Sequence, residues 1–227
     1  MNKRLAFILS VIIAFMLTLQ ACSDVNTTAS KKSMPPFDLV INEGFSDALG
    51  FYDSTPNFSW KLPVSRDVLS QSQYQIVVAS QAELLPNTPD LWDSAIVPSG
   101  ETTFINYEGK TLSSRQAVYW QVKFWDEQKN ESSWSEIAKF ELGLLSNSDW
   151  SANWIEIDNP EPIALNEYKT PIHIPQHLRT EFTTVQSIKK ARLYITAKGI
   201  FEAFINGQRV GSDILTPGYT PYKKRIE

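Results

Sequence analysis

The chain has 227 residues, of which 42% are hydrophobic and 12% aromatic, including seven Trp. This length fits one or two domains, and the apolar content is sufficient for a core, which argues against intrinsic disorder. The 21 Lys and Arg against 25 Asp and Glu give a net charge of −4. Because no basic excess is present, we expect no nucleic-acid partner. The single cysteine excludes an internal disulfide framework and a cysteine-based zinc site.

Residues 1–21 have the organisation of a secretory signal helix. Lys3 and Arg4 form a positive start, and the apolar stretch Leu5–Leu19 is too short for the roughly 20 residues of a permanent membrane span. Leu19-Gln20-Ala21-Cys22 resembles the bacterial lipobox, in which the cysteine becomes the lipidated first residue of the mature protein. We therefore expect lipid on Cys22 to attach the protein to the membrane. Ordinary signal cleavage, with Cys22 left as a thiol, is the alternative.

Residues 22–35 are mostly polar and predict a flexible tether. Ser23, rather than Asp, follows the cysteine, which is similar to outer-membrane sorting in Gram-negative bacteria. We therefore expect a cell-envelope protein, anchored in the outer membrane. The sequence leaves open whether it faces the periplasm or the medium.

Residues 36–145 have the pattern of half-buried β-strands. Apolar and polar residues alternate in Phe58–Leu62, Tyr74–Ala79 and Trp120–Phe124, and turn-forming residues separate these runs. About seven such strands in about 110 residues predict an all-β sandwich of the fibronectin type III or immunoglobulin kind. No cysteine pair joins its sheets, so an aromatic core must supply the stability.

Residues 149–227 predict a second, incomplete β-sandwich. We expect strands at Leu178–Val185, Ala191–Ala197 and Ile200–Ile205. Asn206-Gly207 then gives the strongest hairpin signal that a short sequence can offer. Only about four strands follow Trp154, fewer than a closed sandwich needs, so we expect a truncated module.

Several motifs resemble the bacterial α-L-rhamnosidases of glycoside hydrolase family 78. In the first module these are Trp92-Asp93-Ser94, Tyr119–Asp126, Trp134-Ser135-Glu136 and the junction Gly143-Leu144-Leu145, Asp149-Trp150 and Trp154-Ile155. In the second they are Leu178–Phe182, Ala191–Ile195, Gly199–Gly207, Leu215–Thr220 and Tyr222–Arg225. The resemblance implies that residues 36–145 are the family's fibronectin type III-like domain and residues 149–227 its N-terminal β-sandwich. It also implies that a catalytic (α/α)6 barrel, which is absent here, packs on residues 149–227.

The resemblance implies hydrolysis of terminal α-L-rhamnose from rhamnose-containing glycans or glycosides with inversion, by carboxylates on the absent barrel. We therefore expect no catalytic residue in this chain and no activity from it alone. His173 and His177 are four residues apart, but Pro171 and Pro175 exclude the helix that would align them on a metal. No cofactor or metal site is expected.

Exposed aromatic rings can stack on sugars or pack against another domain. Our candidates for such contacts are Trp125, Trp134, Asp213, Tyr219 and Tyr222. For the Trp and Tyr rings, domain packing is the more ordinary role. A stand-alone cell-surface carbohydrate-binding or adhesion lipoprotein is the alternative function, and a gene fragment without function is a third.

Overall fold

The computed structural model describes residues 32–65, 68–158, 164–165, 167–169, 171–172, 175–218 and 220–222. The candidates Cys22 and Tyr219 lie outside these residues, as does His173. The chain divides into two compact units, Met1–Asn153 and Trp154–Glu227. Within the described ranges, no helix combines the length and the apolar character that crossing a bilayer requires.

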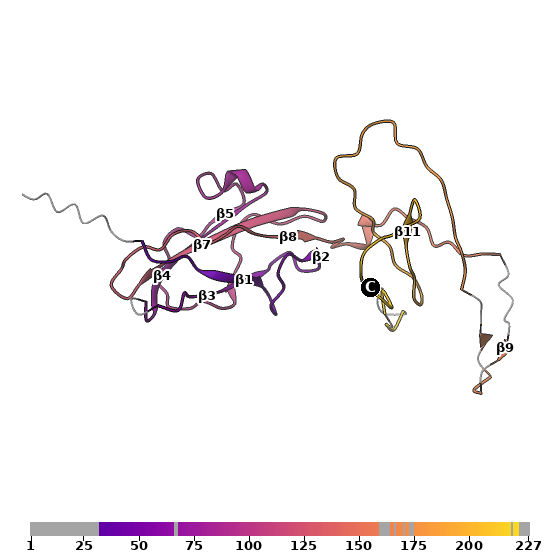
Figure 1. Cartoon of the computed structure of the whole chain (residues 1–227), viewed down its shortest axis with the longest axis horizontal. Helices are drawn as coiled ribbons and strands as arrows, with labels where there is room; N and C mark the ends of the chain where they lie inside the picture. The colour runs from indigo at the N-terminus through magenta and orange to yellow at the C-terminus, as the bar shows by residue number, and fades with distance from the viewer. Residues whose placement is uncertain are drawn as a thin grey trace, which may run out of the picture. The chain divides into compact units, whose positions relative to one another are not determined.

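The first unit is a sandwich of two β-sheets (Figure 1). Its elements are β1 (Phe37–Ile41), β2 (Leu49–Phe51), β3 (Asn57–Lys61), β4 (Gln71–Ala79), η1 (Ala82–Leu84), β5 (Trp92–Asp93), β6 (Ile105–Asn106), β7 (Ala117–Asp126), β8 (Ala138–Leu142) and η2 (Asn147–Asp149). One sheet has the order β1-β3-β6 and the other β2-β8-β7-β4-β5. All neighbours are antiparallel except β2 and β8, which pair in parallel. The predicted all-β, immunoglobulin-like sandwich is confirmed.

Strands β4 and β7 form the centre of the five-stranded sheet. Their register places Tyr74 opposite Phe124 and Val78 opposite Trp120, as the alternating sequence predicted for a common face. All four side chains are buried. Ser33, which lies within the predicted tether, forms a bridge with Ser132.

Aromatic side chains join the two sheets. The Phe58 ring on β3 lies 4.5 Å from the Trp120 ring on β7, measured between centroids. The Trp60 ring lies 5.3 Å from that of Tyr74, and the indole N–H of Trp60 donates to Gln71 Oε1 at 3.1 Å. These contacts supply the cross-sheet connection that a disulfide provides in other sandwiches.

Gly109 allows the chain after β6 to pass close to Trp92. A Cβ at position 109 would lie 2.5 Å from Trp92 Cβ, and 2.6 Å from both the Leu91 carbonyl oxygen and the Tyr107 ring. Trp92 stacks on Phe58 at 6.1 Å between centroids. Trp92 is half-buried and packs against the core, and only glycine fits beside it.

We expect Gly109→Ala to lower the free energy of unfolding of the first unit by about 1–3 kcal/mol, because the added methyl group overpacks the site. Urea denaturation followed by Trp fluorescence would measure the change. The exposed neighbour Glu108 provides the control, since Glu108→Ala should change stability by less than about 0.5 kcal/mol. Equal stability of the two variants would contradict the packing argument.

Hydrogen bonds of Asp149 fix the conformation of the chain that follows β8. Its side chain and that of Ser146 form a capping box around η2, and the Ser114 hydroxyl donates to Asp149 Oδ2. The Arg115 guanidinium donates to the Asp149 carbonyl oxygen at 2.6 Å. Hydrogen bonds from the Ser114 hydroxyl and then the Ser146 amide hold the pKa of Asp149 below its usual value of 3.8.

The lowered pKa of Asp149 makes the first unit sensitive to acid. The folded-state pKa lies below the unfolded-state value, so the stabilisation is complete above the unfolded-state pKa and disappears as pH falls through the folded-state pKa. We expect stability to decline below about pH 4, and Asp149→Asn to make that decline shallower. Burial raises the pKa values of Asp53 and Asp90, but hydrogen bonds lower them by more, so both pKa values lie below the usual value. These two carboxylates therefore contribute to the loss of stability in acid that remains in Asp149→Asn.

Urea denaturation at a series of acidic pH values would check this, with Asp47→Asn at an exposed loop position as the control. A decline in Asp149→Asn as steep as in the control would show that Asp149 is not responsible.

The described strands of the second unit are short. They are β9 (Ala164–Leu165) paired with β10 (Pro171–Ile172), and β11 (Phe204–Ile205) paired with β12 (Gln208–Arg209). The predicted hairpin is confirmed, because Asn206 (φ 51°) and Gly207 (φ 78°) form the two-residue turn between β11 and β12.

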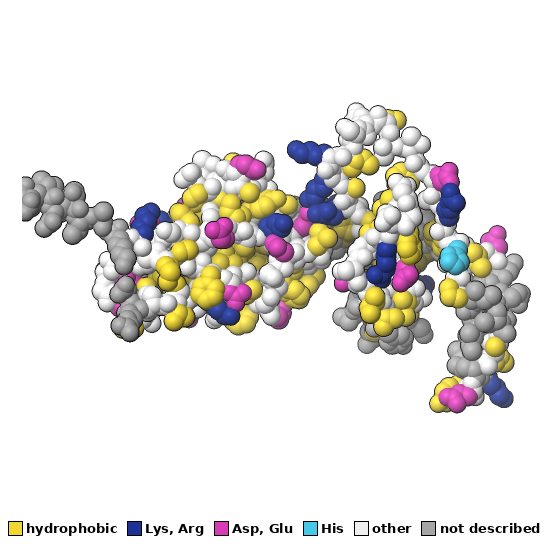
Figure 2. Space-filling model, in the orientation of Figure 1, with side chains coloured by type: hydrophobic (Ala, Val, Ile, Leu, Met, Phe, Trp, Pro, Cys, Tyr) yellow, Lys and Arg dark blue, Asp and Glu magenta, His cyan; other side chains and the backbone are white. Residues whose placement is uncertain are grey.

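The strands predicted at Leu178–Val185 and Ala191–Ala197 are not present, so that prediction was wrong. An alternating sequence forms a strand only where it can hydrogen-bond to a neighbouring strand and pack its apolar face against another layer. Large apolar side chains of these segments instead face solvent. They are Leu178, Phe182, Val185, Leu193 and Ile195. Figure 2 shows hydrophobic side chains on the surface of the second unit.

Candidate functional site

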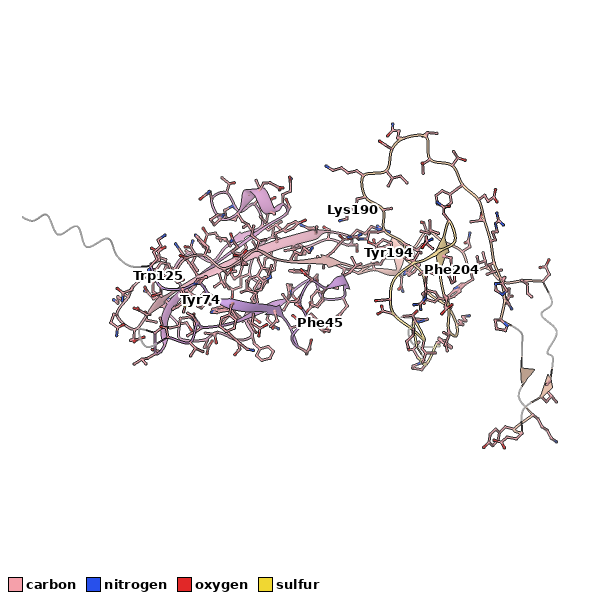
Figure 3. The ribbon with its side chains drawn as sticks, in the orientation of Figure 1. Phe45, Tyr74, Trp125, Lys190, Tyr194 and Phe204 are labelled. Atoms are coloured by element: carbon pink, nitrogen blue, oxygen red, sulfur yellow. The ribbon has the colours of Figure 1, made fainter. Side chains whose placement is uncertain are left out.

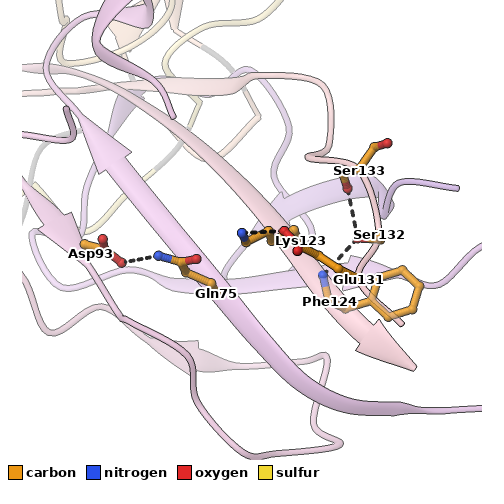
Figure 4. Close-up of polar contacts among 7 residues, drawn as sticks. All are labelled: Gln75, Asp93, Lys123, Phe124, Glu131, Ser132 and Ser133. Atoms are coloured by element: carbon orange, nitrogen blue, oxygen red, sulfur yellow. Dashed lines mark hydrogen bonds and ion pairs between the residues drawn. The ribbon is translucent and has the colours of Figure 1, made fainter. Parts of the chain in front are cut away.

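The outer face of the five-stranded sheet brings together two of the candidate aromatic residues. Lys123 Nζ lies 5.0 Å from the centroid of the Trp125 ring and 4.8 Å from that of the Trp134 ring. The same ammonium group pairs with Glu131 Oε1 at 2.7 Å (Figure 4). We name these four residues the Lys123 cluster. The Lys123 side chain is only 15% exposed, so the Glu131 carboxylate and the two Trp rings surround its ammonium group in place of most of the water.

The strand geometry explains how the Lys123 cluster forms. Lys123 and Trp125 are two residues apart on β7, so both point away from the core that Phe124 enters. Trp134 comes from the segment between β7 and β8. Each ring already interacts with the ammonium group, and a cation–π contact of this kind contributes roughly 0.5–2 kcal/mol. Contact of either ring with sugar or with another domain stays a prediction.

Serine hydroxyls hold residues 131–135 against β7. The Phe124 N–H donates to Ser132 Oγ at 3.0 Å, and the Ser132 N–H donates to the Phe124 carbonyl at 2.9 Å (Figure 4). The Val122 N–H likewise donates to Ser135 Oγ at 3.1 Å, and the Ser135 N–H donates to the Val122 carbonyl at 2.9 Å. Both serines are buried. The segment therefore completes the hydrogen bonding of β7 where β8 does not reach.

Other polar groups of this face also have local partners. Gln75 Nε2 donates to Asp93 Oδ1 at 2.8 Å (Figure 4). The Ala95 N–H donates to the same oxygen at 2.9 Å. Gln121 Nε2 donates to the Ser135 carbonyl at 2.6 Å, while Gln121 Oε1 is buried and has no hydrogen-bond partner among the described residues. Asp93 and Glu131 are therefore each engaged in local contacts of this face.

The remaining described candidates belong to the second unit. Asp213 is exposed, and its carbonyl oxygen accepts a hydrogen bond from the Arg209 guanidinium. Arg209 also lies 3.6 Å from the Glu202 carboxylate. Tyr222 is half-buried and lies two residues after Thr220, which is buried. Nothing in this arrangement brings two carboxylates together.

Metal binding finds no support among the described residues. No group of three or more His, Cys, Asp or Glu side chains in that part of the chain could hold an ion. His177 is exposed. A hollow in the second unit is lined by the single continuous stretch of residues 183–190, which contains no carboxylate.

Sequence reasoning missed Lys123, Ser132 and Ser135. Lys123 could have been found, because it lies two residues before Trp125 on the same strand, and residues two apart on a strand share a face. The serines gave no such signal, since a hydroxyl that accepts from a neighbouring strand looks the same in sequence as one in a solvated loop.

Both modules match known protein families. Residues 39–146 match the Rha78A-like N-terminal immunoglobulin domain, and residues 186–227 match the alpha-L-rhamnosidase N-terminal domain. The chain carries the amino-terminal domains of the α-L-rhamnosidase family. The Lys123 cluster lies wholly within the first of these rhamnosidase-family domains.

The relatives are several times longer than this chain. An alpha-L-rhamnosidase from Formosa agariphila is 56% identical over 189 residues, which cover 83% of this chain and 20% of the relative. Another, from Alteromonas sp., is 42% identical over 209 residues, covering 91% and 22%. The solved α-L-rhamnosidase structure from Dictyoglumus thermophilum has a TM-score of 0.72 and 33% identity, covering 87% and 23%. The chain thus spans about a fifth of the length of these rhamnosidases.

The serine contacts can be tested within one segment of this rhamnosidase-family domain. We expect Ser132→Ala to lower the free energy of unfolding by about 1–3 kcal/mol, because it leaves the buried Phe124 N–H without its acceptor. Ser133→Ala is the matched control, since Ser133 lies between the two buried serines and is itself half-buried. Urea denaturation would compare the two variants. A loss in Ser133→Ala equal to that in Ser132→Ala would contradict the proposed role of the hydroxyl.

Proposed function

We propose that this chain forms the amino-terminal, non-catalytic region of a secreted, lipid-anchored α-L-rhamnosidase. The single observation that supports this most is the ordered match of both modules to rhamnosidase amino-terminal domains, with 56% identity to one rhamnosidase. The whole enzyme would hydrolyse terminal α-L-rhamnose from glycans or glycosides with inversion. Its general acid and base would lie outside these 227 residues.

The two units would serve the enzyme in different ways. The first is a sandwich with a closed aromatic core, suited to separating a catalytic domain from the membrane. The second exposes large apolar side chains, among them Ile200 and Phe204, and would pack against the catalytic domain. Lipid on Cys22 would anchor the enzyme in the cell envelope, in the outer membrane.

The purified chain should release no rhamnose from an aryl α-L-rhamnoside. An inverting glycosidase needs an acid and a base roughly 6.5–9.5 Å apart with a water between them, and the carboxylates described above serve local contacts instead. A colorimetric assay at high protein concentration, with an active full-length rhamnosidase as the positive control, would measure this. Rhamnose release above the blank would overturn the non-catalytic role.

Lipidation is tested by the mass of the mature amino terminus after expression in a Gram-negative host. We expect a peptide that begins at Cys22 and carries acyl chains, because the lipobox-like sequence directs both events. Cys22→Ala should give no lipidated product and remain uncleaved at this position. A mature chain that begins elsewhere, or an unmodified Cys22, would refute the anchoring.

A further inference from the structure

The chain enters the first unit at one end of the sandwich and leaves it at the other. The Ser33 N–H donates to the Glu131 carbonyl at 3.3 Å, so the described chain begins beside the turn that follows β7. The Arg115 N–H donates to the Gly143 carbonyl at 3.0 Å, so the chain leaves beside the start of β7. The ten residues of β7 span about 30 Å. Figure 3 shows Trp125 and Phe45 toward these opposite ends, which we name the Ser33 end and the Gly143 end.

The Ser33 end exposes apolar side chains. Ser65 and Val68 form an antiparallel bridge, which places Val64 and Leu69 across from each other in the loop between β3 and β4. Val64 is 95% exposed and Leu69 80% exposed, although Val68 beside them is buried. The Leu69 N–H donates to Glu127 Oε2 at 3.3 Å, which ties this loop to the end of β7. Two large apolar side chains therefore project from the Ser33 end.

Exposed lysines lie beside these apolar side chains, together with acids. Lys32 and Lys129 are exposed there. Glu131 pairs with Lys123, whereas Glu127 accepts backbone N–H bonds and keeps its negative charge, and exposed Glu101 lies at the same end, because Gln71 at the start of β4 donates to its carbonyl. Apolar side chains flanked by lysines are the composition that favours seating in a membrane interface.

The length of chain between Cys22 and the described first unit limits how far the Ser33 end can lie from a lipid on Cys22. Nine residues separate Cys22 from Lys32. Fully extended, the ten steps between these two residues span at most about 35 Å. With lipid on Cys22, the Ser33 end is thus the part of the described first unit held nearest to the bilayer.

We propose that the Ser33 end of the first unit rests on the membrane surface, with Val64 and Leu69 entering the headgroup region. This inference depends on the proposed lipidation of Cys22. We call this contact of the Ser33 end with the membrane surface the seat. It turns the Gly143 end away from the lipid and gives the first unit a defined orientation, whereas a tether alone would leave the unit free to rotate.

The test uses the full lipidated chain reconstituted in phosphatidylcholine vesicles that contain lipids with a quencher on the acyl chain. Single thiols are introduced as Leu69→Cys or, for control, as Asn147→Cys in η2 at the Gly143 end, and are labelled with an environment-sensitive dye. The lipidated Cys22 sulfur is a thioether and does not react. We expect a blue shift and quenching of the dye at position 69, and neither at position 147.

Each outcome decides a different point. An unmodified Cys22 in the amino-terminal peptide overturns the anchoring and the seat together. A lipidated Cys22 with equal quenching at positions 69 and 147 overturns the seat alone. A dye at position 69 that shifts without lipid quenching is covered by protein, which also overturns the seat.

Discussion

The first unit depends on aromatic packing between its two sheets. Phe58 from β3 contacts Trp120 from β7 at the centre, with ring centroids 4.5 Å apart. Such pairs contribute about 0.5–1.5 kcal/mol beyond the burial of their surfaces. Trp60 can be buried because Gln71 accepts its indole N–H, and the Gln71 amide in turn donates to backbone carbonyls at Ser99 and Glu101. The core therefore joins the sheets without a disulfide and without leaving these polar groups unsatisfied.

Strand β7 connects this core to the outer face. It pairs with β4 over Tyr119–Asp126, but β8 pairs only with Ala117–Trp120. The rest of that edge would expose backbone groups to pairing with other chains. Ser132 and Ser135 cover it with hydroxyl and backbone hydrogen bonds, and the Lys123 cluster fixes the covering segment from outside. The same strand thus determines the core, the edge protection and the arrangement of the half-buried Trp125 and Trp134 rings.

Sequence predicted the features that depend on local pattern. Alternation identified the faces of β4 and β7, and Asn206-Gly207 identified the hairpin, because both signals act over a few residues. It failed for Leu178–Val185, where a strand requires partners that alternation cannot specify. The parallel pairing of β2 with β8 joins residues about 90 positions apart and left no mark in either segment. For Lys123 the sequence could predict only part of its environment. Its face follows from its position on β7, but Glu131 and Trp134, which contact it, come from the segment after β7.

The acids of the first unit illustrate why resemblance to a hydrolase does not locate a hydrolytic site. Asp126 is 1% exposed and accepts hydrogen bonds from the backbone of Gln128 and Asn130, which shapes the turn after β7. Asp149 caps η2, and Glu131 neutralises Lys123. Each of these carboxylates is therefore engaged in a contact within its own unit. These side chains therefore build the sandwich itself.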